Sequence, residues 1–177
     1  MSEQSNIVME KIIRKWGLPP CIKMIESDID YKFDDKDLAN TTERGYGFEG
    51  GKIKFCLYDK INRNVLFSMD FHKINPRLSA IWRVNGKPMS ERSIKLELLY
   101  VHDESIRQQG IASYYIEKLR NYAIQEGMEC IYVRADANAD NFKNDKKKDA
   151  LSQEELEKFY DSKSTDEMPI IRMNKHP

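Results

Sequence analysis

The fold of this chain is decided by residues 94–133, which read IKLELLYVHDESIRQQGIASYYIEKLRNYAIQEGMECIYV. Ile94–Val101 is an apolar run with few interruptions, as expected for a strand that is buried on both faces. From Gly110, apolar residues recur at helical spacing as far as Gly127, where a helix C-terminal glycine is expected. Cys130–Val133 then forms a short apolar strand. This order predicts a right-handed βαβ crossover with two parallel strands.

Upstream of this crossover, two runs alternate in hydrophobicity. Ile53–Leu57 and Val65–Phe71 each have an apolar residue at every second position, and residues 59–64 between them supply turn chemistry. We therefore expect a β-hairpin. Residues 75–93, which follow it, read as a polar connection that contains proline.

The two ends of the chain add further elements. Residues 7–16 have helical spacing and are stopped by Gly17 and two prolines, and Cys21–Ile25 predicts a short strand. Ser152-Gln153-Glu154-Glu155 matches the capping box that opens a helix. Met168–Met173 predicts a last strand, so we expect one α/β domain over residues 1–177. Within it, 1–51 is an opening helix with a variable segment, and 52–173 is the core.

Composition excludes several classes of protein. The chain has 177 residues, of which 40% are hydrophobic, and no apolar run reaches the ~20 residues needed to cross a bilayer. Its 29 basic and 29 acidic side chains balance, which argues against a general nucleic-acid binder. Three widely spaced cysteines and a start without a secretory pattern favour the cytoplasm. The histidines and cysteines show no close metal-binding spacing, so we expect no metal.

One short motif points to chemistry. Arg107-Gln108-Gln109-Gly110-Ile111-Ala112 lies between the strand 94–101 and the following helix. A turn there directs successive backbone N–H groups and the positive end of the helix dipole at one spot, as in a pyrophosphate site. Gly110 allows a phosphate to approach the backbone, Ala112 is small enough for close contact, and Arg107 adds a cation.

These six residues match R/Q-x-x-G-x-G/A, and the chain over roughly 52–162 resembles the GNAT superfamily of N-acetyltransferases. The resemblance implies a GNAT-like acyl-CoA-binding fold, with a central twisted, mostly antiparallel sheet, a parallel strand pair splayed at the cofactor site, and flanking helices. It implies acetyl-CoA as co-substrate, bound between the two parallel strands. The implied cofactor contacts are Leu99, Val101, Arg107, Gln108, Gln109, Gly110, Ile111 and Ala112.

Acyl transfer to an amine needs a base for the amine and a proton for the leaving thiolate. Glu97 is the candidate base, since it puts a carboxylate into an otherwise apolar strand. The equally weighted alternative is a glutamate at the sheet surface that pairs with a lysine. His102 is a second candidate base by its intrinsic pKa, or else a histidine of a surface loop.

Tyr160 is the candidate acid, because a phenol has a pKa near that of a thiol and the resemblance places the family's acid at this position. The alternative is a core aromatic residue. Lys143, Lys146, Lys147 and Lys148 either meet the 3′-phosphate of CoA or form a solvated loop. Trp82 and Tyr46 either flank the acceptor or belong to the core.

The sequence thus favours an N-acetyltransferase of the EC 2.3.1 type that acts directly on a primary amine of a small molecule or peptide. A homodimer is compatible with the sequence. The rival hypothesis is a non-catalytic CoA-binding regulatory module or an interaction scaffold. An acetyltransferase that acts on charged transfer RNA fits less well with zero net charge.

Overall fold

The structure is a computed structural model that describes residues 3–33, 53–79, 81–138 and 148–173. The expectations for residues 34–51, which include Tyr46, lie outside the described residues. The same holds for Lys143, Lys146 and Lys147.

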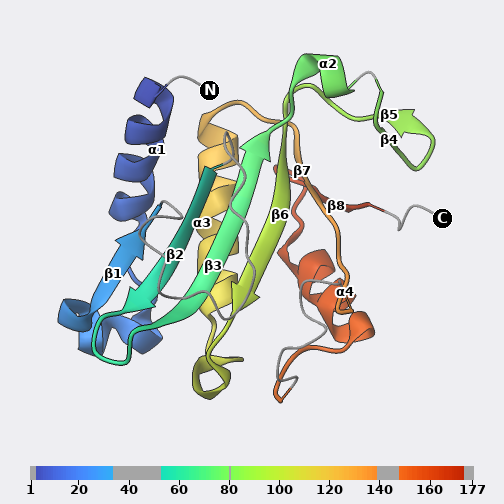
Figure 1. Cartoon of the computed structure of the whole chain (residues 1–177). Coiled ribbons are helices and arrows are strands. Elements are labelled where there is room, and N and C mark those ends of the chain that lie inside the picture. The colour runs from blue at the N-terminus through green and yellow to red at the C-terminus, as the bar shows by residue number, and fades with distance from the viewer. Residues whose placement is uncertain (1–2, 34–52, 80, 139–147, 174–177) are drawn as a thin grey trace. The chain divides into compact units, whose positions relative to one another are not determined.

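The described residues form a mixed α/β fold with a six-stranded sheet in the order β1-β2-β3-β6-β7-β8 (Figure 1). The strands of this sheet are β1 (Ile29–Lys32), β2 (Ile53–Asp59), β3 (Asn64–Lys73), β6 (Ser93–Val101), β7 (Cys130–Val133) and β8 (Ile170–Arg172). The α-helices are α1 (Glu3–Trp16), α2 (Pro76–Ser79), α3 (Ile111–Gln125) and α4 (Gln153–Lys163). β1 and β2 are antiparallel, whereas β6–β7 and β7–β8 are parallel pairs. The mixed α/β class is therefore confirmed, and the finer GNAT-like arrangement stays a prediction.

The chain divides into two compact units. The first unit contains Met1–Asp70 and Leu98–Tyr114, and the second contains Phe71–Glu97 and Tyr115–Pro177. β3, β6 and α3 each contribute residues to both. The expectation of one domain over residues 1–177 stays a prediction.

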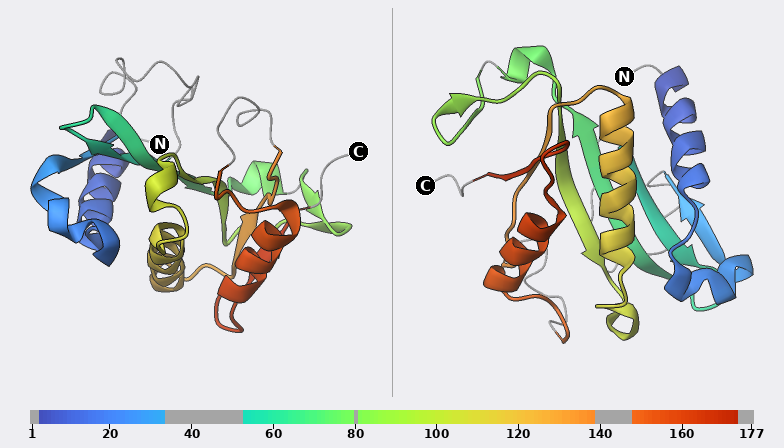
Figure 2. Two further views of the ribbon diagram at one scale, coloured as in Figure 1. Left: turned by 90° about the horizontal axis from the view of Figure 1, so that it is seen from below. Right: turned by 180° about the vertical axis from the view of Figure 1, so that it is seen from behind.

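In the first unit, α1 confirms the predicted opening helix and lies on one face of the β1–β2 end of the sheet (Figure 2). It ends because Gly17 takes a φ of +72° and donates its N–H to the Arg14 carbonyl at 3.2 Å. The ring of Trp16 meets that of Phe55 edge-on, with the ring centroids 6.3 Å apart. This contact fixes the end of α1 on β2.

The predicted strand Cys21–Ile25 is wrong. These residues lie in a 3-10 helix, η1 (Pro20–Asp28), because Pro20 at its start fixes φ in the helical range. The extended chain starts only at Ile29, as β1. The β2–β3 hairpin is confirmed, and the Asp59 carboxylate closes its turn by accepting from the N–H groups of Ile61 and Asn62 at 2.8 and 2.9 Å.

In the second unit, the parallel strands predicted by the crossover are confirmed. Ser93–Leu96 of β6 pair with Cys130–Val133 of β7, and Ile131–Val133 pair in turn with Ile170–Arg172 of β8. Both views of Figure 2 show α4 beside this end of the sheet. The predicted last strand is therefore present, and it is parallel to β7.

Residues 75–93, expected to be a plain connection, instead contain α2 and a small hairpin. Its strands are β4 (Arg83–Val84) and β5 (Lys87–Pro88), which are antiparallel. Asn85 and Gly86 between them have φ values of +54° and +77°, the backbone of a type I′ turn. The Asn-Gly pair is a sequence signal for this hairpin. It was missed because the surrounding residues are mostly polar.

Candidate functional site

The loop from β6 to α3 carries the predicted pyrophosphate-binding residues and belongs to the first unit. After Val101 the chain makes a short 3-10 turn, η4 (Glu104–Ile106), before α3 begins at Ile111. Asp103 closes this turn, since its carboxylate accepts from the Ser105 N–H at 2.8 Å and from the Ser105 hydroxyl at 2.6 Å. The loop therefore holds part of its shape with its own hydrogen bonds.

Arg107 is buried within this loop, with 9% of its surface exposed. Its Nε donates to the Val101 carbonyl at 3.1 Å, and its Nη2 donates to the Tyr100 hydroxyl at 3.1 Å and to the His102 carbonyl at 3.5 Å. Hydrogen bonds from a charged donor are stronger than neutral ones. The guanidinium thus joins the loop to the end of β6, and its contact with a phosphate stays a prediction.

His102 is buried, so the alternative of a surface-loop histidine is wrong. Its backbone N–H donates to the Leu66 carbonyl at 2.8 Å, and its Nε2 is hydrogen-bonded to the Ser68 hydroxyl at 2.8 Å. The ring lies edge-on to Tyr100, with 4.8 Å between the ring centroids. Sequence analysis missed this role because the partners of His102 lie on β3, more than thirty positions upstream.

Gly110 stands at the entrance to α3. Its φ of +87° is a conformation that L side chains rarely adopt, and a Cβ added there would meet nothing within 4 Å. The first bond of the helix runs from the Tyr114 N–H to the Gly110 carbonyl at 2.9 Å. Among the described residues, none accepts a hydrogen bond from the N–H groups of 110–113. These donors therefore have no acceptor among the described residues, next to a residue without a side chain.

The other predicted cofactor residues lie close to Gly110 in the sequence. Gln108 and Gln109 are exposed, and Ile111 is buried. Leu99 and Val101 are half-buried on β6. The structure thus gathers all eight predicted cofactor residues in the first unit, and Glu97 and Tyr160 belong to the second.

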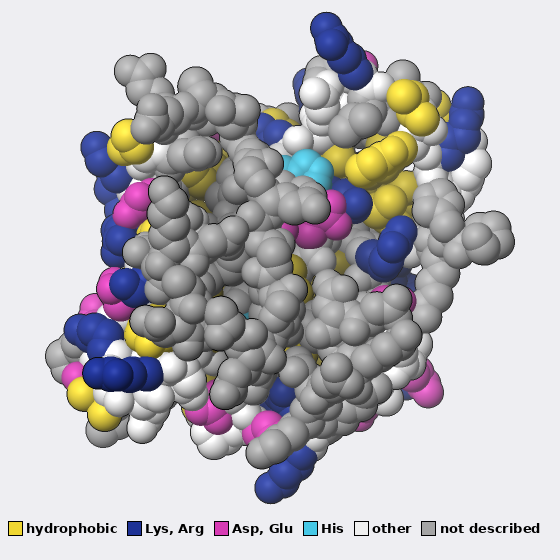
Figure 3. All heavy atoms as spheres, in the orientation of Figure 1, with side chains coloured by type: hydrophobic (Ala, Val, Ile, Leu, Met, Phe, Trp, Pro, Cys, Tyr) yellow, Lys and Arg dark blue, Asp and Glu magenta, His cyan; other side chains and the backbone are white. Residues whose placement is uncertain are grey.

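Glu97 lies in a charged cluster of the second unit. Its Oε1 is 2.8 Å from Lys95 Nζ and 3.9 Å from His72 Nδ1. Lys95 Nζ also lies 4.6 Å from the centroid of the Trp82 ring. Figure 3 shows such a grouping, with a histidine next to acidic, basic and hydrophobic side chains. The lysine-paired glutamate weighed as the alternative is thus present, and the partner is Lys95.

Lys95 and His72 are residues of this cluster that sequence reasoning missed. Lys95 stands two positions before Glu97, and side chains two apart on a strand share a face. That spacing could have identified Lys95 from the sequence. His72 lies on the neighbouring strand β3, so its approach depends on strand register, which the sequence pattern did not specify.

Tyr160 is buried on α4, with 4% of its surface exposed. Its ring lies edge-on to Phe159 at 5.3 Å between centroids, and within the described ranges its hydroxyl makes no hydrogen bond. Buried tyrosine hydroxyls usually find a partner. Burial also raises the pKa of Tyr160, so the phenol keeps its proton at neutral pH.

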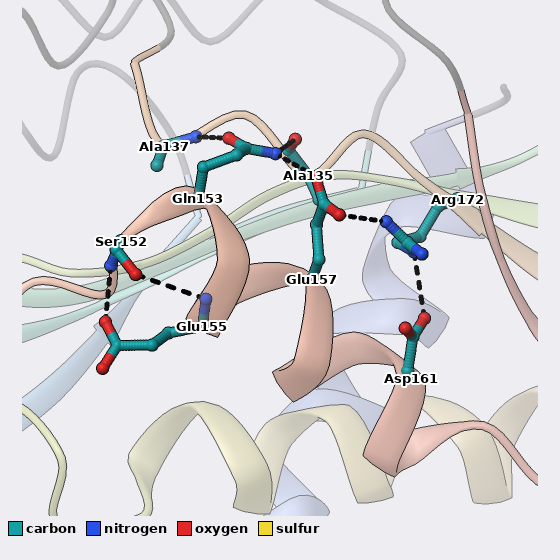
Figure 4. A network of polar contacts seen from close by, with 8 residues as sticks. All are labelled: Ala135, Ala137, Ser152, Gln153, Glu155, Glu157, Asp161 and Arg172. Carbon is teal, nitrogen blue, oxygen red and sulfur yellow. Dashed lines mark hydrogen bonds and ion pairs between the residues drawn. The ribbon is translucent and has the colours of Figure 1, made fainter.

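A polar network fixes α4 on its neighbours (Figure 4). Arg172 of β8 holds Glu157 at 2.6 Å and Asp161 at 2.9 Å, one helical turn apart. Gln153 donates to the Ala135 carbonyl at 2.8 Å, just after β7. Since Tyr160 is adjacent to Asp161 in the helix, these contacts hold the phenol in position.

Comparison with known proteins places the chain in no family, because no protein-family model, curated protein or solved structure matches it. In the part of the chain that the structure describes, no three potential metal ligands of the His, Cys, Asp or Glu type gather. Over the same residues, no helix combines the length and the apolar character that a bilayer crossing requires.

Proposed function

We propose that this chain is an acyl-CoA-dependent N-acetyltransferase of the cytoplasm that transfers an acetyl group from acetyl-CoA to a primary amine. The observation that carries the proposal is the start of α3. There, a Cβ at Gly110 would have nothing within 4 Å, and the following backbone N–H groups bind no described residue. A helix N-terminus of this kind attracts phosphate through its donors and its dipole.

Support for the cofactor comes from the residues that surround these donors. Gly110 has the positive φ and the missing side chain that close approach of a diphosphate requires. The loop stands in a strand–loop–helix–strand order whose strands β6 and β7 are parallel, as the resemblance to the GNAT superfamily implies. In the proposal the N–H groups of 110–113 hold the pyrophosphate, and Arg107 keeps the loop in shape.

The chemical step needs one base and one acid. Acetyl-CoA supplies the acetyl group as an activated thioester. Glu97, directly or through a water, accepts the proton that the acceptor ammonium must lose before its nitrogen forms the amide bond. Tyr160 gives its proton to the sulfur as the carbon–sulfur bond breaks, and the phenolate regains a proton as the amide nitrogen loses its second one. Burial raises the pKa of Tyr160, so the phenol carries its proton until the thiolate leaves, but it is a weaker acid than an exposed tyrosine.

Calorimetric titration with acetyl-CoA tests the cofactor part of the proposal. We expect one site per chain with a dissociation constant in the range of about 1 μM to 1 mM that is usual for substrates. Addition of the free diphosphate, pyrophosphate, should weaken acetyl-CoA binding by competition. A chain that binds no acetyl-CoA would overturn the proposal.

A thiol-release assay over a panel of small amines and peptides tests the transfer itself. The Tyr160→Phe variant should reduce kcat by at least about tenfold, because the sulfur then lacks its proton donor. The thermal midpoint should stay the same, since the hydroxyl makes no hydrogen bond to a described residue. Tyr122→Phe is the control for turnover alone, because Tyr122 is a buried tyrosine of α3 whose hydroxyl, unlike that of Tyr160, is hydrogen-bonded to Lys73. Equal turnover in the two variants would remove Tyr160 from the mechanism.

The second candidate function is a CoA-binding module without turnover. The ion pair between Lys95 and Glu97 favours it, since the candidate base is already neutralised by a neighbouring ammonium. Tight binding of acetyl-CoA with no thiol release from any amine of the panel would support this candidate over the transferase.

A further inference from the structure

The second unit holds a lysine ammonium between an aromatic ring and a carboxylate. Lys95 Nζ lies 2.8 Å from Glu97 Oε1 and 4.6 Å from the centroid of the Trp82 ring. The side chain of Lys95 is only 11% exposed. Burial of an ammonium is unfavourable unless partners offset the loss of its hydration. Trp82 and Glu97 are the partners that make this position favourable for a positive charge.

The two partners are held in place independently of the lysine. Glu97 follows Lys95 by two positions on β6, so the strand itself fixes the carboxylate on the same face. Trp82 packs against a buried apolar cluster that consists of Ile74, Val84, Met89, Cys130 and Tyr132. The arrangement therefore has the two parts by which proteins bind an alkylammonium, a ring face and a carboxylate.

We propose that Trp82 and Glu97 form a binding site for a primary alkylammonium group, and that Lys95 is its tethered occupant in the ligand-free chain. The ammonium of the acceptor displaces Lys95 and takes its place against Glu97. This last step rests on the proposed transferase function, whereas the ammonium site itself does not. The acceptor class that follows is an amine carried on a flexible alkyl chain, as in a lysine side chain or a polyamine.

Displacement is physically reasonable because one ammonium replaces another. The charge of Glu97 stays compensated throughout, so the exchange does not leave a buried carboxylate unpaired. The released Lys95 side chain regains rotamer freedom, which helps to offset the immobilisation of the ligand. His72 Nδ1, at 3.9 Å from the same carboxylate oxygen, limits the volume available next to it.

The same unit contains a second lysine–carboxylate–aromatic trio that serves as an internal control. Lys73 Nζ lies 2.6 Å from Glu126 Oε2 and 5.8 Å from the centroid of the Tyr122 ring. The side chains of Lys73 and Glu126 are 43% and 39% exposed. Water therefore competes with every charge in this trio, and we expect no ammonium site there.

The first test uses the wild-type chain, so it does not depend on the folding of a variant. With isotope label at the lysine ε-carbon, the ring current of Trp82 should shift the NMR signal of the Lys95 ε-methylene away from the other lysines. Titration with n-butylammonium should move this signal toward the ordinary lysine position and saturate, while the Lys73 signal stays unchanged. n-Butanol is the neutral control and should move neither signal.

The second test uses fluorescence of Trp82 in a Trp16→Phe background, where it is the remaining one of the two tryptophans of the chain. Lys95→Met should bind n-butylammonium at least about tenfold more tightly than the parent, because the tethered competitor is gone. Lys73→Met should bind it as the parent does. Adding Glu97→Gln to Lys95→Met should abolish the gain.

The proposal is overturned if n-butylammonium leaves the Lys95 signal in place, or if n-butanol moves it equally. It is also overturned if Lys73→Met gains affinity as much as Lys95→Met. Neither test contains acetyl-CoA, so ammonium binding without thiol release would contradict the transferase function alone. If amines support thiol release but n-butylammonium does not move the Lys95 signal, the ammonium site alone would be contradicted.

Discussion

The two helices that follow long loops in this chain, α3 and α4, begin in opposite ways. At α4, the Ser152 hydroxyl accepts from the Glu155 N–H at 3.3 Å, and the Glu155 carboxylate accepts from the Ser152 N–H at 2.8 Å (Figure 4). At α3, no acceptor for the N–H groups of 110–113 exists among the residues that the structure covers. One helix start is closed by its own side chains, and the other keeps its donors available.

A helix end that only stabilises the fold can be distinguished from a ligand-binding one by its first-turn donors. A capping box satisfies the donors of the first turn and stabilises the helix. At α3 the same donors have no acceptor among the described residues, and the glycine that precedes the helix has a positive φ. If α3 binds no anion, its open start has no evident benefit, so the comparison can be tested at both helices.

The largest effect is expected at Gly110. Gly110→Ala should weaken acetyl-CoA binding by about tenfold to hundredfold, because an alanine is strained at a φ of +87° and its methyl group hinders a close approach to the backbone. Gly127→Ala is the matched control, since Gly127 also has a positive φ, +66°, and nothing within 4 Å of an added Cβ. Both variants should lose a similar ~1 kcal/mol of stability. Calorimetry measures the acetyl-CoA affinity of both variants. Equal affinity in Gly110→Ala and Gly127→Ala would contradict the proposal that the start of α3 binds the cofactor.

The next effect concerns the support of the α3 loop. Arg107→Met should lower the free energy of unfolding by about 2 kcal/mol, because the loss of a buried charged donor leaves its carbonyl and hydroxyl partners unsatisfied. Arg83→Met is the control, as Arg83 is exposed and its side chain donates to the Gly86 carbonyl at 3.2 Å. Denaturant titration measures both. A loss no greater at Arg107 than at Arg83 would show that the α3 loop needs no such support.

At α4 we expect a smaller effect, and one confined to stability. Ser152→Ala should cost about 1 kcal/mol of unfolding free energy, because the Glu155 N–H loses its acceptor. Acetyl-CoA affinity should not change. Ser162→Ala, at an exposed position of the same helix, is the control and should leave stability nearly unaltered. Weaker acetyl-CoA binding in Ser152→Ala would contradict the prediction that the α4 cap affects stability alone.

The smallest effect is the pH dependence of the α4 cap. Hydrogen bonds from the backbone and the side chain of Ser152 lower the pKa of Glu155 from its ordinary 4.5. Its carboxylate therefore stabilises the folded state above that pH, and the contribution is lost as pH falls through the lowered pKa. The stability difference between the wild type and Glu155→Gln should shrink on acidification from neutral pH. A difference that stays constant with pH would show that the charge of Glu155 does not act in the cap.

The sequence pattern predicted the elements that are long and periodic. Residues 94–133 formed the expected strand, helix and parallel strand, because their apolar spacing is consistent over many positions. The sequence pattern did not predict the short elements correctly. The 3-10 helix η1 and strand β1 together span residues 20–32, too few for a period to show.

The candidate site was predictable in its backbone and less so in its side chains. The place of Gly110 before α3 follows from local sequence, since helix starts and glycine turns are local features. The burial of His102 does not, because it depends on Ser68 and Leu66 of a strand that is distant in the chain. Contacts of this kind are set by strand pairing, which one sequence leaves open.

The hydrogen bond from the Tyr114 hydroxyl to the Trp16 carbonyl links α1 to the first turn of α3. Gly17 follows directly, and its φ of +72° is a conformation that L side chains rarely adopt. Regions that are joined in this way open together in amide hydrogen exchange. Protection of the amides after 113 in α3 should therefore depend on whether α1 is docked. Undocking of α1 would then also loosen the start of α3, where the diphosphate is proposed to bind.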